Sequence, residues 1–103
     1  MGKDRAIKIL GNVVGNIVLH KILFAHTNKP ESRHHLKSEV EAYRDNALDI
    51  ASEFNWNDSD IEEIKSEALT QFKKDIEKYY SDVKFPIDEP KKLIEETLNE
   101  ILL

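Results

Sequence analysis

The sequence contains no cysteine among its 103 residues. A chain without thiols forms no disulfide framework, no cysteine nucleophile and no zinc site with thiolate ligands. The same absence is typical of proteins from reducing compartments, so we expect a cytoplasmic location. A chain of this length forms one domain and buries a hydrophobic core without covalent cross-links.

Long hydrophobic runs are also absent. The longest segment without a charged residue is ILGNVVGNIVLH, residues 9–20, and its twelve residues fall short of the roughly 20 needed to span a bilayer. Lys21 interrupts the apolar pattern, and no A-x-A cleavage pattern follows it. We therefore expect neither a signal peptide nor a membrane partner.

Motifs of several enzyme classes are missing from the chain. There is no H-E-x-x-H pair, no glycine-rich phosphate loop and no nucleophile elbow. The acidic doublets, such as Glu62 with Glu63 and Glu95 with Glu96, occur where helix caps or exposed helix faces are expected. We therefore predict a protein that is not an enzyme and that needs no cofactor.

Apolar residues recur at steps of three and four, which predicts amphipathic α-helices. In the second helix these steps connect Val40, Tyr43, Ala47 and Ile50. No alternation typical of a strand persists, so the predicted fold class is all-α. The expected helices span residues 4–26, 30–54, 60–80 and 89–102.

Capping residues mark the starts of two predicted helices. Asn28 with Glu31 and Pro30 is typical of the start of the second, and Ser59 with Glu62 resembles a capping box for the third. The first two connections are about three to five residues long, so the first three helices should run antiparallel in a single-domain bundle. The longer third connection lets the last helix cross the others or reach another chain.

A Gly-Asn pair occurs twice, four residues apart, inside the first helix. Each glycine costs about 0.5–1 kcal/mol relative to alanine in a helix interior, so a close approach of a second backbone should offset that cost. Asparagines beside such a seam can fix its register. The pattern favours a homodimer packed through the first helix. The predicted interface consists of Gly11, Asn12, Gly15, Asn16, Val18 and Ile22.

Two other interpretations of this segment stay open. The first helix is apolar over much more than the usual stripe, so it can also be the central helix of a monomeric bundle. Gly11 and Gly15 would then admit a bulky side chain such as Trp56 or Phe72. The β-branched run between residues 11 and 19 is also compatible with a strand, although its flanks favour a helix.

All four histidines lie within residues 20–35, around the turn between the first two helices. His35 and Glu39 are four residues apart, so they share one helix face. With His26 they would supply three ligands for zinc or another divalent ion. A metal-binding protein that uses this histidine cluster is therefore an alternative function.

Charge is distributed unevenly along the chain. Residues 1–38 hold seven basic and two acidic residues, whereas the whole chain has a net charge of −5. Anion or nucleic-acid binding through the basic third is a further alternative, although an acidic protein repels nucleic acid at range. The candidate anion contacts are Lys3, Arg5, Lys8, Lys29, Arg33 and Lys37.

Aromatic and aliphatic residues gather around the longest connection. Tyr79, Tyr80, Val83, Phe85 and Ile87 would form a patch for a protein partner if several of them are exposed. Alternatively, Tyr79 and Phe85 close the core beneath the last helix. The function that the sequence favours is a small non-enzymatic interaction or assembly protein, with itself and an unidentified protein as partners.

Overall fold

The computed structural model of the protein describes residues 2–26 and 30–102, and for residues 30–37 it describes the backbone alone. These residues form four α-helices: α1 (Lys3–His26), α2 (Pro30–Ala51), α3 (Asp58–Tyr79) and α4 (Glu89–Leu102). No β-strand occurs in the described ranges, so the predicted all-α bundle of four helices is confirmed.

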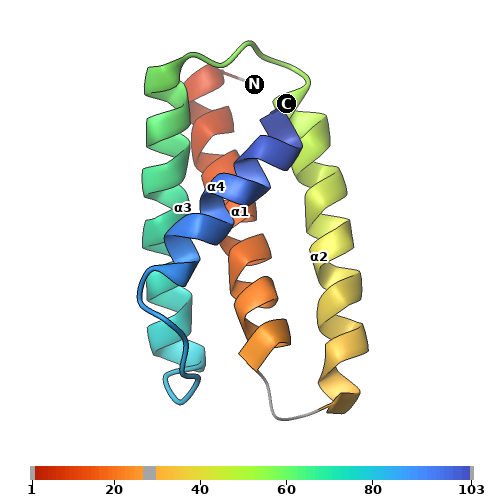
Figure 1. Ribbon diagram of the computed structural model, residues 1–103. Helices are drawn as coiled ribbons and strands as arrows, with labels where there is room; N and C mark the ends of the chain where they lie inside the picture. Colours follow the sequence, from red (N-terminus) through yellow and green to blue (C-terminus); the bar gives the residue numbers. More distant parts are fainter. Residues whose placement is uncertain (1, 27–29, 103) are drawn as a thin grey trace.

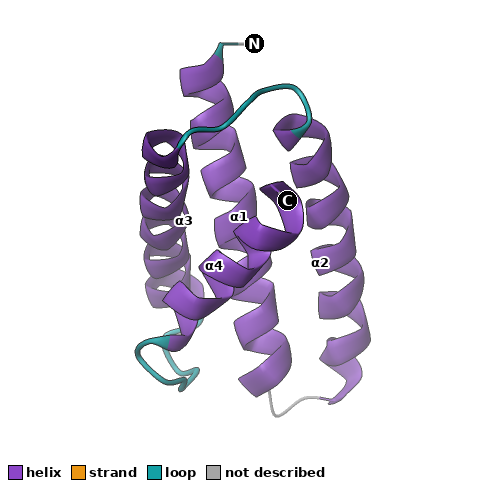
Figure 2. Cartoon of the chain, turned by 45° about the horizontal axis from the view of Figure 1, so that its top comes forward, coloured by secondary structure: helices purple, strands orange, loops and turns teal. Residues whose placement is uncertain are grey.

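The first three helices lie side by side and alternate in direction, with α1 between α2 and α3 (Figure 1). The shorter helix α4 crosses one face of this layer diagonally, as the turned view also shows (Figure 2). α1 contacts each of the other three helices, whereas α2 and α3 do not meet in the described part of the chain. The bundle is therefore built around α1.

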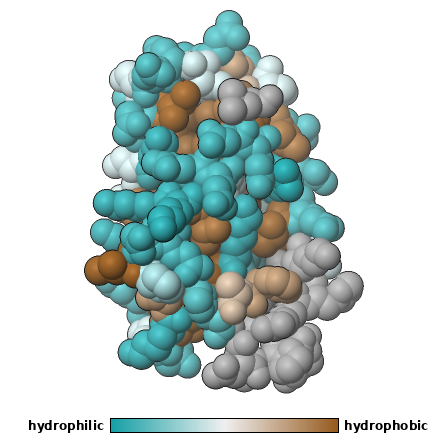
Figure 3. Space-filling model, viewed as in Figure 1, coloured by the Kyte–Doolittle hydropathy of each residue, from teal (hydrophilic) through white to brown (hydrophobic). Residues whose placement is uncertain are grey.

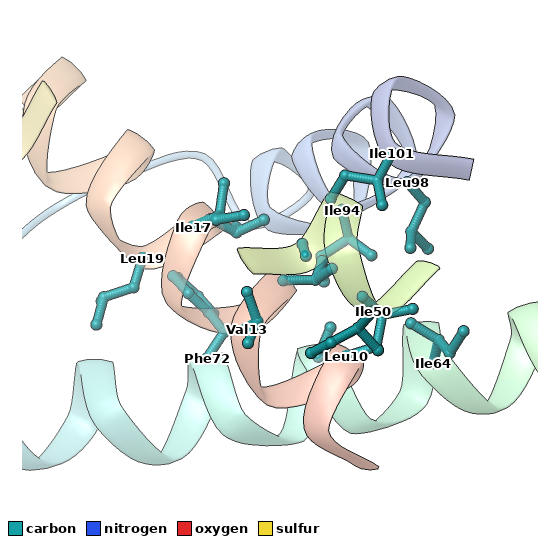
Figure 4. Packing of buried hydrophobic residues seen from close by; sticks show 14 of the residues in the cluster. Leu10, Val13, Ile17, Leu19, Ile50, Ile64, Phe72, Ile94, Leu98 and Ile101 are labelled. Atoms are coloured by element: carbon teal, nitrogen blue, oxygen red, sulfur yellow. The ribbon is translucent and has the colours of Figure 1, made fainter. Parts of the chain in front are cut away.

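The core follows from the wide apolar arc of α1. Leu10, Val14 and Val18 are completely buried, and so is Ile22 near the other end of the helix. Figure 4 shows side chains of all four helices meeting at this core. The residues labelled there from the neighbouring helices are Ile50, Ile64, Phe72, Ile94, Leu98 and Ile101. Three helices cover one, which explains an apolar arc wider than the usual stripe.

α1 is long and apolar enough to cross a membrane by length and composition, which the length of its uncharged run did not indicate. In the structure, 61% of its apolar window is buried inside the bundle. Helix α1 thus satisfies its apolar surface by contact with α2, α3 and α4 of the same chain.

The two glycines of α1 lie against the backbone of α3. A Cβ atom on Gly11 would come within 3.3 Å of the carbonyl oxygen of Ile64, and one on Gly15 within 2.9 Å of that of Ala68. The predicted close approach of a second backbone occurs, but that backbone belongs to the same chain. The monomeric alternative had assumed that a bulky side chain such as Trp56 or Phe72 fills the space beside the glycines. Neither side chain does so.

This placement corrects the predicted dimer interface. Gly11, Gly15, Val18 and Ile22 are buried within one chain, so they offer no surface to a second copy. Asn12 alone of the six residues is fully exposed, on the side of α1 that faces solvent. The helix pattern required a close partner, and α3 supplies it because two short connections bring α3 back alongside α1.

The end of α2 lies three residues before the predicted one. The helix stops at Ala51, and the Trp56 indole Nε1 donates a hydrogen bond of 3.0 Å to the Ala51 carbonyl oxygen. The Ser52 hydroxyl likewise donates to the Asp49 carbonyl oxygen. Because side chains satisfy these terminal carbonyl groups, the chain leaves the helix before Phe54.

The start of α3 lies two residues before the predicted one. Asn57, not Ser59, is the N-cap, and its side-chain oxygen accepts a hydrogen bond from the Asp60 amide at 2.8 Å. The Asp60 carboxylate in turn accepts one from the Asn57 amide at 3.1 Å. The capping box predicted for this helix is therefore present two residues earlier. The predicted cap at Asn28 lies outside the described residues.

Candidate docking groove

A groove runs between the second half of α3, the α3–α4 connection and the first turn of α4, and we call it the α3–α4 groove. Its volume is about 860 Å³. The apolar residues that line it are Leu69, Phe72, Ile76, Tyr80, Val83, Phe85, Ile87 and Pro90. Four charged side chains also line it, namely Lys73, Glu77, Asp88 and Lys91.

The floor of the groove belongs to the hydrophobic core. Phe72 is 2% exposed, and Phe85 packs edge-to-face on it, with ring centroids 5.6 Å apart. Such a pair stabilises a fold by about 0.5–1.5 kcal/mol beyond its buried area. Phe85 therefore closes the core beneath α4, as one of the two sequence interpretations proposed.

Exposed aliphatic and aromatic side chains lie at the rim of the groove and beside it. Ile87 is 94% exposed, Tyr79 is 62% exposed, and the two rings of Tyr79 and Tyr80 lie 6.4 Å apart. Tyr79 thus does not close the core with Phe85. Figure 3 shows a mostly hydrophilic face with a hydrophobic protrusion at its lower left edge, beside the start of α4.

Hydrogen bonds hold the connection in a folded turn. The Tyr80 amide donates to the Ile76 carbonyl oxygen, and the Val83 amide donates to that of Tyr80, each at 3.0 Å. The Glu89 amide donates to the Pro86 carbonyl oxygen at 3.1 Å. The exposed position of Ile87 therefore follows from a defined turn.

Asp88 lies beside Ile87, at the start of α4. Its own backbone amide and the Lys92 ammonium, 3.3 Å away, both lower the pKa of this carboxyl below its ordinary value. A carboxylate at the first turn of a helix is also favoured by the helix dipole. The charge of Asp88 is therefore fixed at neutral pH.

A second groove of about 740 Å³ lies at the other end of the bundle. Leu48, Trp56, Ile61 and Leu98 are among its apolar lining residues. Its Trp56 ring packs on Phe54 and lies beneath the Lys3 ammonium, 5.7 Å from the ring centroid. The two aromatic side chains that line this groove, Phe54 and Trp56, thus already have contacts within the chain.

Of the three residues of the predicted metal site, the two whose side chains are described have different partners. His26 Nε2 lies 3.0 Å from a Glu89 carboxylate oxygen of α4, whereas Glu39 is paired with His20. The side chain of His35 lies outside the described residues. No three His, Asp or Glu groups among the described side chains are placed to hold a metal ion. Each described histidine instead links α1 to a neighbouring helix.

Three of the candidate anion contacts have described side chains, and all three lie in the first two turns of α1. Lys3 forms an ion pair with Asp60, while Arg5 and Lys8 are exposed on α1. The Lys3 pair lowers the pKa of the Asp60 carboxyl, and the hydrogen bond from the Asn57 amide lowers it further. Of the other predicted contacts, Lys29 and the side chains of Arg33 and Lys37 lie outside the described residues.

The geometry defines a class of protein, a small all-α bundle with a central first helix and an apolar groove at one end. No family model matches the chain, and neither the curated proteins nor the solved structures gave a match.

Proposed function

We propose that this chain is a small, non-enzymatic protein-interaction module that binds its partner through the α3–α4 groove. The observation that carries the proposal is Ile87, whose side chain is 94% exposed at the rim of an apolar groove. A large aliphatic side chain in water forgoes about 1.5–3 kcal/mol of hydrophobic stabilisation, which a partner can recover.

Two further features support binding at this surface. Tyr80 lines the groove and Tyr79 lies exposed beside Tyr80, and tyrosine is among the residues enriched at protein interfaces. The core contacts of Phe72 and Phe85 hold the floor in place, so a partner meets a preformed surface. The sequence alone places these aromatic and aliphatic residues together, but it is compatible both with a patch for a partner and with closure of the core.

Site-specific photocrosslinking in the native cell tests the proposal. A photoreactive phenylalanine analogue replaces Ile87, where the full exposure leaves room for it. The matched control carries the same analogue at Asp45, an exposed residue of α2 without an ion pair in the described structure. We expect protein adducts from position 87 and none, or few, from position 45.

An adduct with a second copy of the chain counts as binding through this surface, as does an adduct with a different protein. The proposal is wrong if position 87 gives no adduct, or if both positions give the same adducts in equal yield. Circular dichroism of both proteins before irradiation checks that the fold is unchanged.

A further inference from the structure

We infer that the occupant of the α3–α4 groove is the same groove of a second copy of this chain, in a two-fold symmetric dimer. The inference rests on the proposed function, because it names the partner of that surface. It also moves the homodimer predicted from the sequence away from the first helix.

The shape of the surface favours a second copy as the partner. Ile87 protrudes at the rim of a groove of about 860 Å³, but with 94% of its surface exposed it does not fill that groove itself. A two-fold rotation places the Ile87 of each copy over the groove of the other. One symmetric contact thereby buries the Ile87 side chain of both copies and fills the α3–α4 groove of both copies.

The charges at the rim of the groove also favour a second copy. Lys73 and Glu77 lie one helical turn apart on α3, and Asp88 and Lys91 lie at the start of α4. Each helix therefore presents one basic and one acidic side chain. A strongly basic or acidic partner gains no net electrostatic attraction from a rim whose charges cancel. A second copy of this surface, related by a two-fold rotation, can place its acidic side chains opposite the basic ones and its basic side chains opposite the acidic ones.

The register of that contact follows from the symmetry. When the α3 segments of two copies run antiparallel across a two-fold axis, Lys73 of each copy faces Glu77 of the other. Neither side chain forms an ion pair within the described part of its own chain, so both are available. Two reciprocal pairs then form, which sets the alignment of the copies more than the affinity.

Sedimentation equilibrium of the purified chain is the primary test. Between about 1 µM and 1 mM we expect the mass to rise from 12.0 kDa toward twice that value. Ile87→Asp should remain monomeric over this range, because an aspartate cannot enter an apolar groove without losing its hydration. Leu48→Asp is the matched control, since Leu48 is a partly exposed leucine at the other end of the bundle, and it should associate like the unchanged chain.

Charge exchange tests the register without relying on Ile87. Lys73→Glu and Glu77→Lys should each weaken self-association by about fivefold or more, because each change turns two attractive pairs into two repulsive ones. An equimolar mixture of the two variants should associate at least as tightly as the unchanged chain. The double variant Lys73→Glu/Glu77→Lys should recover association as well, because it exchanges both members of each pair.

A chain that stays at 12.0 kDa up to about 1 mM overturns the second copy as partner. A dimer that persists in Ile87→Asp but is lost in Leu48→Asp overturns it as well, because the interface then lies at the opposite groove. Adducts with other proteins from position 87 would still support the proposed function in both cases. The absence of any adduct at position 87 would contradict the proposed function itself.

Discussion

Gly15 occupies a position where even one methyl group meets backbone. Its added Cβ would lie 2.9 Å from the Ala68 carbonyl oxygen and 3.1 Å from Gln71 Cβ, so α3 would have to move away from α1. Gly15→Ala gains up to about 1 kcal/mol of helix propensity, but overpacking of this kind costs about 1–3 kcal/mol. We expect a net loss of about 1–2 kcal/mol in the free energy of unfolding, measured in urea.

Asn12→Ala is the control for this substitution. Asn12 is exposed on the same helix, so alanine brings the propensity gain without a steric clash. We expect the control to be as stable as the unchanged chain or slightly more stable. Equal stabilisation by both alanines would show that the two backbones are not in close contact at Gly15.

Asp60 makes the stability of the fold depend on pH. The Lys3 ammonium and the Asn57 amide hold the pKa of this carboxyl below its ordinary value of about 3.9. A carboxyl whose pKa is lower in the folded state stabilises that state above the unfolded-state pKa. This contribution is lost as the pH falls from about 4 through the lower folded-state pKa.

Asp60→Asn isolates that contribution. The variant should be less stable than the unchanged chain at pH 7, and the difference should shrink as the pH falls below about 4. Chemical unfolding at a series of pH values measures it. Asp45→Asn, which removes an exposed carboxylate without an ion pair in the described structure, should leave the pH profile unchanged. A stability difference for Asp60→Asn that is constant over this pH range would contradict the explanation.

At the scale of elements, α4 is attached by two kinds of contact. Ile94, Leu98 and Ile101 face the core, and the Glu100 carboxylate lies near Lys21 of α1 and Arg44 of α2, at 3.8 and 3.3 Å. Ion pairs at exposed positions contribute about 0–1 kcal/mol, whereas truncation of a buried leucine costs about 2–5 kcal/mol. Apolar burial therefore dominates the attachment of α4.

Leu98→Ala and Glu100→Gln separate the two kinds of contact. We expect Leu98→Ala to lower the free energy of unfolding by about 2–4 kcal/mol and Glu100→Gln by less than about 1 kcal/mol. Thermal unfolding at low and at about 1 M salt measures both, since salt screens the exposed pairs. A larger loss in Glu100→Gln would show that the ion pairs hold the helix in place.

Features of these helices that depend on interactions close in the sequence could be predicted, and those that depend on more distant residues could not. The periodic apolar residues of α3 and α4 specify both helices, because that signal is repeated over many residues. The start of α3 was misplaced because Asn57 and Ser59 are both good N-caps with an acidic residue three positions later. The Trp56 side chain that satisfies the end of α2 lies beyond the helix, where periodicity carries no information.

At the scale of the whole molecule, the sequence indicated that a backbone approaches Gly11 and Gly15 but not which one. A small-residue pattern fits a second copy and a neighbouring helix equally well, because both present the same helical surface. The partner of His26 is equally hidden, since Glu89 is 63 residues away in the sequence. The aromatic and aliphatic residues between Tyr79 and Ile87 indicated an apolar surface in this region. The shape of the groove could not be predicted, because it depends on how α4 crosses the other helices.

The central position of α1 predicts the order in which the helices open. α1 is covered by three helices, whereas α4 is a helix of 14 residues that lies across one face of the layer. Local openings release the elements with the fewest buried contacts first, so α4 should detach while α1 remains folded. We expect amides of α1 between Leu10 and Ile22 to exchange with solvent only through global unfolding.

Native-state hydrogen exchange measures this order of opening. Amides of α4 around Leu98 should be protected at least about tenfold less than those of α1, which corresponds to an opening free energy lower by about 1.4 kcal/mol. Low concentrations of denaturant should accelerate the exchange of α4 amides less than that of α1 amides, because detachment of α4 exposes less surface than global unfolding. Equal protection and equal denaturant dependence in both helices would mean that α4 unfolds only with the rest of the bundle, as one cooperative unit.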